Sequence, residues 1–107
     1  MKSEIKELLN KLGIKINVKG YWFWITAIEY KAKHEDINMS ELYDEVAKLH
    51  NTTRSRVERA LRHAYEYVKE DLKKYFNINY DINNSAFLLL ALEDIRKEKV
   101  NIWEKLD

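Results

Sequence analysis

The arginines of this chain are concentrated in one short segment. Four of the five lie within nine residues, at Arg54, Arg56, Arg59 and Arg62, whereas the fourteen lysines are spread along the sequence. Arginine suits phosphates and the edge of guanine because its planar guanidinium presents paired donors. The formal net charge is only +1, so the distribution of charge, and not its total, points to nucleic acid.

The arginine segment is expected to form a helix that follows a shorter helix and a tight turn. Thr53 can cap that helix, Asn51 tolerates the left-handed conformation of a turn, and Ala47 is small enough for a close helix crossing. On a helical wheel the arginines lie opposite a single apolar stripe. This stripe consists of Val57, Ala60, Leu61, Ala64 and Val68. We therefore expect a DNA-binding helix-turn-helix over about residues 42–71.

Geometry assigns different roles to the polar side chains of this helix. Arg56 and Arg59 are expected to reach base edges, and Glu58 either accepts from cytosine N4 or orients a neighbouring arginine. Contacts with the DNA backbone are expected from Thr53, Ser55, Arg62 and His63, and from Lys19 at the start of an earlier helix. The alternative is a solvated charged face, in which Arg62 and Glu66 form an i, i+4 ion pair.

Other residue types that carry chemistry do not form a recognisable set. His34, His50 and His63 lie on three segments without the spacing of metal ligands, there is no cysteine, and no glycine-rich phosphate loop is present. His50 is expected to close the core of the helix-turn-helix, and His34 to lie at a helix end. We expect no enzyme activity, cofactor, metal or small-molecule substrate.

The elements that position the arginine segment are expected to be helices. Proline is absent and there are only two glycines, which favours an all-α fold of five or six helices. The expected order begins with a helix over 3–12 capped by Ser3, an extended connector over 14–18, a helix over 19–34 and a helix capped by Asn38 or Ser40. The arginine helix over 53–71 follows, and then a short turn of helix over 72–76 that is either separate from it or continuous with it. A loop over 79–84 leads to a last helix from Asn84 to about Lys97.

Two apolar segments have more than one interpretation. The aromatic run Tyr21 to Trp24 could stack on single-stranded bases, but its place in an apolar helix favours the core. The leucine-rich last helix has more apolar surface than one face needs, so it packs either on a second subunit or on Ile102 and Trp103 of its own tail.

Composition bounds the remaining possibilities. A chain of 107 residues with 46% hydrophobic residues is expected to fold as a single domain over 1–107 with a real core. It has no apolar run of the roughly 18 residues that a membrane span needs, and no apolar signal-peptide region, so an intracellular protein is expected, which is cytoplasmic if the source is bacterial.

Long stretches of the sequence resemble a known family, the C-terminal effector domain of the stage-zero sporulation protein A family. The run from Asn51 to Ala64, with Ser55-Arg56-Val57-Glu58-Arg59 at its centre, is very similar to that family's recognition helix and its preceding turn. Lys19-Gly20-Tyr21 resembles the opening of the domain, and Asn84-Ser85-x-Phe87 is a weaker similarity. The resemblance covers about residues 13–95.

The resemblance implies a six-helix transcription factor domain that binds short boxes with a G·C-containing core, often as tandem dimers. It also implies that Arg56, Glu58 and Arg59 face bases, while Ser55, Arg62 and His63 lie at the backbone. Family members normally carry a phosphoacceptor receiver domain, and these residues contain nothing that could accept a phosphoryl group in that way. The segment between Val68 and Asn84 is shorter than in the family, which affects the usual dimer contact.

Together these features predict a transcriptional regulator that binds double-stranded DNA in a sequence-specific manner. A homodimer on DNA is one arrangement that this prediction includes. The alternative from another class is a non-catalytic interaction module that antagonises a related regulator through its apolar last helix. The complete arginine set argues against that alternative, because an inhibitor has no need of base-reading side chains.

Overall fold

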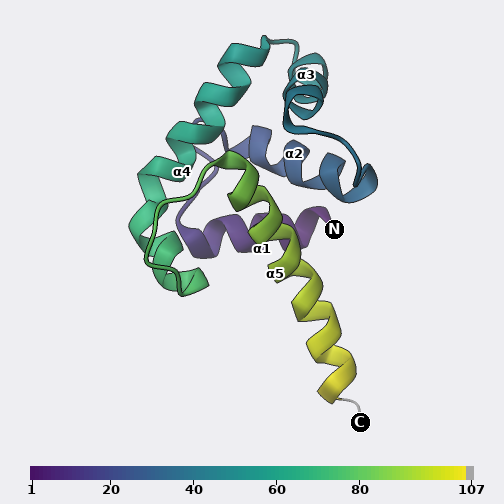
Figure 1. Ribbon diagram of the computed structural model, residues 1–107, viewed down its shortest axis with the longest axis vertical. Coiled ribbons are helices and arrows are strands. Elements are labelled where there is room, and N and C mark those ends of the chain that lie inside the picture. The colour runs from purple at the N-terminus through teal and green to yellow at the C-terminus, as the bar shows by residue number, and fades with distance from the viewer. Residues whose placement is uncertain (106–107) are drawn as a thin grey trace.

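The described part of the chain folds into five helices. The computed structural model describes the backbone of residues 1–105 and the side chains as far as Lys97. Its helices are α1 (Lys2–Leu12), α2 (Tyr21–Lys33), α3 (Met39–Leu49), α4 (Arg54–Phe76) and α5 (Asn84–Lys105), with no strand among the described residues (Figure 1). The all-α prediction is confirmed, and the helix count is five, not six.

The turn of helix expected over 72–76 is continuous with α4, which was one of the two alternatives. Residues 72–76 continue this helix without a break because Leu72 is fully buried on the same stripe as Val68. The helix ends at Asn77, which adopts a left-handed conformation (φ 56°) and whose amide donates to Lys74. α4 therefore includes this turn as well as the predicted 53–71, and in Figure 1 it runs from the top of the view down the left side of the molecule.

The helices surround a core to which all of them contribute. α2 packs against each of the other four helices, and α3 packs against both α2 and the start of α4. Figure 1 shows α1 and α2 in the middle of the molecule and α5 leading away from it towards the C-terminus. The position of α4 is therefore set by α2 and α3 together.

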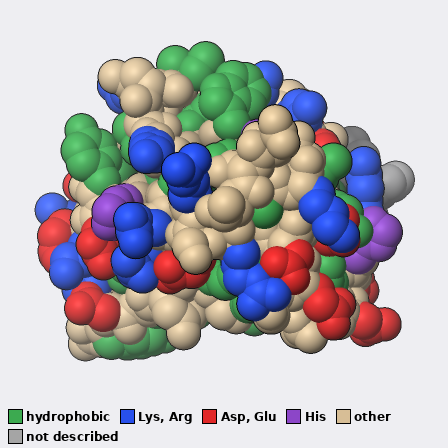
Figure 2. Space-filling view, turned by 90° about the horizontal axis from the view of Figure 1, so that it is seen from above, with side chains coloured by type: hydrophobic (Ala, Val, Ile, Leu, Met, Phe, Trp, Pro, Cys, Tyr) green, Lys and Arg blue, Asp and Glu red, His purple; other side chains and the backbone are tan. Residues whose placement is uncertain are grey.

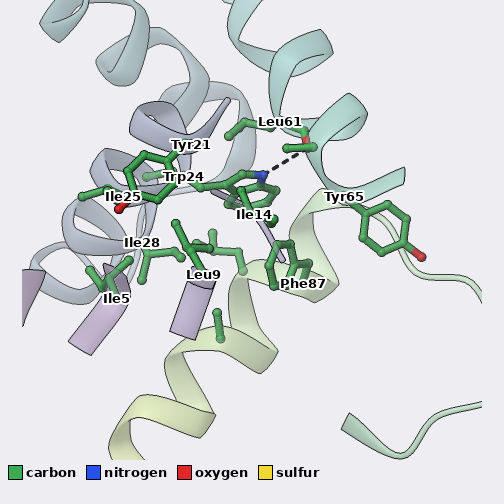
Figure 3. Packing of buried hydrophobic residues seen from close by; sticks show 14 of the residues in the cluster. Ile5, Leu9, Ile14, Tyr21, Trp24, Ile25, Ile28, Leu61, Tyr65 and Phe87 are labelled. Carbon is green, nitrogen blue, oxygen red and sulfur yellow. Dashed lines mark hydrogen bonds between the residues drawn. The ribbon is translucent and has the colours of Figure 1, made fainter. Parts of the chain in front are cut away.

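Trp24 is the central side chain of this core. It is fully buried, its indole lies against Phe87 of α5 with ring centroids 4.6 Å apart, and its Nε1 donates to the carbonyl oxygen of Leu61 at 3.0 Å (Figure 3). Tyr21 is buried too, as predicted for the aromatic run, but Trp22 is 45% exposed. The aromatic run therefore contributes Tyr21 and Trp24 to the core and Trp22 to the surface, because neighbouring residues of a helix point in different directions.

Gly20 allows α2 and α4 to approach closely. It precedes α2 in a left-handed conformation (φ 102°), and a Cβ on this residue would collide with the carbonyl oxygen of Ala60 and lie 3.2 Å from the Cβ of Ala64. Any larger residue would force the two helices apart. The small residues on the apolar stripe of α4 serve the same contact.

Two of the predicted helix caps are wrong. α1 begins after Met1 without a side-chain cap, and the hydroxyl of Ser3 instead donates to the carboxylate of Glu4. At α5 the cap is Asn83, whose side chain accepts from the amide of Ala86, while Asn84 lies buried beneath α4. Of the two candidates at α3, Asn38 is the cap, since its side chain accepts from the amide of Glu41.

The last helix extends beyond the predicted end at Lys97, to Lys105. Leu88 and Leu92 face the core, whereas Leu89 is 55% exposed. The expected packing of this helix on Ile102 and Trp103 lies outside the residues whose side chains are described. Among the described residues, no helix combines the length and apolar character that crossing a bilayer requires.

Replacing Gly20 by alanine should destabilise the fold more than the same change at Gly13. Both glycines have positive φ, which costs a substituted residue about 1–2 kcal/mol, but a Cβ at Gly13 would meet only Val68 Cγ1 at an ordinary 3.4 Å. At Gly20 the collision with the Ala60 backbone adds to that cost, so a total loss of about 3 kcal/mol is expected. Urea unfolding followed by circular dichroism measures both losses, and equal values would contradict the close approach.

Candidate nucleic-acid interface

The connection between α3 and α4 is a tight turn held by backbone hydrogen bonds. Asn51 adopts the predicted left-handed conformation (φ 53°), and the amide of Thr52 donates to the carbonyl of Ala47 at 2.9 Å. Thr53 then caps α4, since its hydroxyl oxygen accepts from the amide of Arg56 at 3.3 Å. The roles predicted for Asn51 in the turn and Thr53 as the cap are confirmed.

His50 lies in the angle between α2 and this turn. Its Nε2 is 2.7 Å from the Thr26 hydroxyl oxygen, and its ring meets the ring of Phe23 edge-on at 4.9 Å. Burial lowers the pKa of His50 below its ordinary value, because the charged imidazolium is less well solvated there. His50 was expected to close the core between the two helices of the helix-turn-helix, but it is only half-buried and its side-chain contacts are with Thr26 and Phe23 of α2.

Arg54 forms an ion pair with α3 that the sequence did not predict. Its Nε and Nη2 donate to both carboxylate oxygens of Asp44, at 2.7 and 2.6 Å. This bidentate hydrogen bond lowers the pKa of Asp44 and raises that of Arg54. The first arginine of the segment therefore braces the two helices.

Arg56 and Arg59 differ from Arg54 in having no ion-pair partner among the described residues. Both are exposed, and with His63 and Lys19 they line a surface hollow of about 450 Å³ between the start of α2 and α4. Phe23, Thr52 and Ala60 complete the lining of this hollow. We call it the basic hollow.

Glu58 and Arg62 lie on the other flank of α4 and are paired with each other. Arg62 Nη1 donates to Glu58 Oε1 at 2.8 Å, whereas the Glu66 carboxylate is 4.0 Å from Arg62 Nε. The sequence suggested an ion pair between Arg62 and Glu66, but Glu58 is the nearer partner. Glu58 is half-buried. Its carboxylate is held beside Arg62 by this hydrogen bond, and the residue does not line the basic hollow.

The remaining predicted contacts lie around the start of α4. Ser55 is exposed and lines a smaller hollow with Arg54 and Ser40, on the same flank as Glu58. The structure thus brings Lys19, Arg56, Arg59 and His63 together and separates them from Ser55, Glu58 and Arg62. Phe23 was missed as part of this surface, because its place on α2 marked it only as a core residue.

Basic side chains lie on the end of the molecule that carries the turn. Figure 2 is viewed from above the orientation of Figure 1, and it shows Lys and Arg side chains across this face, with Asp and Glu side chains beside several of them. No group of three or more His, Asp or Glu side chains among the described residues could hold a metal ion.

An all-helical fold in which a tight turn leads into a long surface helix, whose Arg56 and Arg59 have no ion-pair partner among the described residues, is the arrangement expected of a helical nucleic-acid-binding domain. Residues 5–95 of the 107 match the family described as sporulation initiation factor Spo0A C terminal, and the chain belongs to that family. The family comprises the DNA-binding effector domain of a response regulator that controls transcription in sporulation. It is a regulatory domain and not one known for catalysis.

The family match is wider than the sequence comparison predicted. It begins at Ile5 and so includes α1, whereas the resemblance was expected from about residue 13. Ile5, Leu9 and Leu12 of α1 are all buried, so this helix is part of the core on which α2 rests. The arrangement of α3, the turn and α4 is consistent with the helix-turn-helix of the family.

Protonation of His50 should weaken the fold below neutral pH. Because its pKa is lower in the folded state, the unfolded chain binds more protons once the pH falls below about 6.5, and stability decreases from there towards the folded pKa. Urea unfolding of the parent and of the variant His50→Gln at pH 7.5 and 5.5 tests this. The variant should lose most of the pH dependence, and His34→Gln, at the exposed end of α2, should keep it. A parent-like pH dependence in His50→Gln would disprove the assignment.

Proposed function

We propose that this protein is a sequence-specific double-stranded DNA-binding regulator of transcription, with α3 and α4 as its helix-turn-helix. In this proposal the first turns of α4 enter the major groove. The observation that carries it is the pair of exposed guanidiniums of Arg56 and Arg59, which have no ion-pair partner among the described residues and border the basic hollow. A regulator of this kind acts on chromosomal DNA in the bacterial cytoplasm.

Arg56 and Arg59 are proposed to read bases. Neither side chain has to break an ion pair before it donates to the O6 and N7 atoms of guanine, which is the commonest specific arginine contact in the major groove. The proposal agrees with the boxes containing a G·C core that the family resemblance implies. For Glu58, its 2.8 Å contact with Arg62 supports the second role that the sequence suggested, which is to orient a neighbouring arginine.

The DNA backbone is proposed to lie on both sides of α4. Lys19 and His63 would contact phosphates along the basic hollow, and Ser55 and Arg62 would do so on the other flank. Thr53 and the amides at the start of α4 suit a phosphate because helix N-termini carry a partial positive charge. Phosphate contacts should supply most of the affinity, which should therefore fall steeply with salt.

A second candidate is an interaction through α5, favoured by the exposure of Leu89 on that helix. A second copy of the domain bound to adjacent DNA would be one partner, and a related regulator would be another. An interaction through α5 does not require Arg56 or Arg59, whereas the proposed reading of DNA does.

Removing either unpaired arginine should weaken DNA binding and relax its specificity. Arg56→Ala and Arg59→Ala are each expected to cost about 1–3 kcal/mol in binding free energy with no change in unfolding. Fluorescence anisotropy on a labelled duplex carrying a family-type box, against a scrambled duplex, measures the loss. Arg96→Ala is the matched control, because it removes the same charge from α5, where Arg96 pairs with Glu35.

If the Arg56→Ala, Arg59→Ala double variant bound the box as tightly as the parent, the assignment of these residues would be wrong. If the parent bound box and scrambled duplexes equally, and salt abolished both, α4 would be only a basic surface. In that case the interaction through α5 would be the better account of the protein.

Loss of Lys19 should instead weaken binding equally for all sequences. A lysine that contacts a phosphate carries no base information, so Lys19→Ala should lower affinity for box and scrambled duplexes alike and reduce the slope of log K against log salt by about 1. Anisotropy over a series of salt concentrations measures the slope. Lys33→Ala, at the far end of α2, should leave it unchanged, and an unchanged slope in Lys19→Ala would remove Lys19 from the interface.

A further inference from the structure

A second hollow lies on the flank of α4 away from the unpaired arginines. It occupies about 430 Å³ between α3, α4 and residues 82–85, and we call it the flank pocket. This volume falls within the range of small-molecule sites, about 300–1,000 Å³. Met39 and Ile82 and the rings of Tyr43 and Tyr65 give it mainly apolar walls.

Asn84 belongs to the lining of this pocket and has a buried hydrogen-bond acceptor without a partner among the described residues. The residue is only 6% exposed, and its Nδ2 donates to the Tyr43 hydroxyl oxygen and to the carbonyl oxygen of Glu58, both at 3.3 Å. A backbone carbonyl can only accept, so the contact with Glu58 fixes which end of the amide is Nδ2. Oδ1 is then an acceptor without a partner among the described residues. A ligand that satisfies it must be a donor.

The charges that line the flank pocket favour a cation. Glu58 and Glu66 contribute two negative charges and Arg62 one positive charge, and the Arg62 guanidinium is already paired with Glu58. The hydroxyl oxygen of Tyr65 accepts from the amide of Ile82, which holds the ring in the wall. Aromatic rings attract a cation across their faces, in addition to the attraction of the carboxylates.

We propose that the flank pocket binds a small primary amine with an apolar body. Its ammonium group donates to Asn84 Oδ1 and lies beside the carboxylates of Glu58 and Glu66, while the apolar body packs on Met39, Ile82 and the tyrosine rings. None of these residues belongs to the basic hollow. The ligand site is thus separate from the unpaired arginines.

Occupancy of the flank pocket is coupled to DNA binding through Glu58, and this part of the inference rests on the proposed function. An ammonium group beside Glu58 competes with Arg62 for the same carboxylate. Arg62 then loses the partner that orients it towards the DNA backbone. The ligand should therefore lower the affinity for DNA.

The binding test uses 2-phenylethylammonium chloride as the probe and the full chain labelled with nitrogen-15. Saturable chemical-shift changes are expected at the Asn84 side chain and at the amides of Ile82 and Ser85, and none with the neutral isostere 2-phenylethanol. Glu66→Gln should weaken binding about tenfold, because it removes one charge and leaves the packing intact. Glu70→Gln, one turn further along α4 and outside the pocket, should bind like the parent.

Three results would overturn the site: no saturable shifts, equal shifts with 2-phenylethanol, or equal weakening by Glu66→Gln and Glu70→Gln. The coupling has its own measurement, in which anisotropy on the family-type box is repeated with and without saturating probe. Unchanged DNA affinity at saturation would disprove the coupling alone. Saturable probe binding by a protein that does not prefer the box would disprove the proposed function and leave the ligand site standing.

Discussion

The close approach of α2 to α4 is the constraint on which the rest of this structure depends. Gly20 lies against the backbone of Ala60, and one turn further along α2 Trp24 donates to the carbonyl of Leu61, the residue that follows Ala60 in α4. These two contacts fix which face of α4 lies against α2. Because the apolar stripe of α4 is held against α2, the arginines of the opposite stripe must face outwards.

The orientation of α4 about its own axis also determines which polar side chains lie close together. Arg56, Arg59 and His63 fall on the side towards α2 and meet Lys19 there, whereas Glu58 and Arg62 fall on the side towards Tyr43 and Asn84. One flank of the helix is therefore basic, with no ion-pair partner among the described residues, and the other carries the Glu58–Arg62 pair and a further carboxylate, Glu66. This asymmetry underlies both the proposed reading of DNA by one flank and the proposed ligand site on the other.

The arginines that look equivalent in the sequence have three different situations in the structure. Arg54 pairs with Asp44 of α3, Arg62 is paired within its own helix, and Arg56 and Arg59 have no ion-pair partner among the residues whose side chains are described. Exposed ion pairs add little to stability, in general about 0–1 kcal/mol, so the pairing of Arg54 and Arg62 matters more for where these side chains point. Free guanidiniums remain only where the helix faces the basic hollow.

Local signals in the sequence determined much of this protein: its all-helical class, the turn at Asn51, the cap at Thr53 and the buried stripe of α4. These features depend on a residue's own conformational preference or on helical period, which a sequence displays directly. The family, too, was evident from the run around Arg56. Tertiary structure alone decided the partner of Arg54, the burial of Asn84 and the surface position of Phe23. Each of these depends on which distant segment packs nearby, as when Asn84 lies under α4 and Asn83 takes over the cap. A helical pattern shows which face is buried, but only packing shows what covers it.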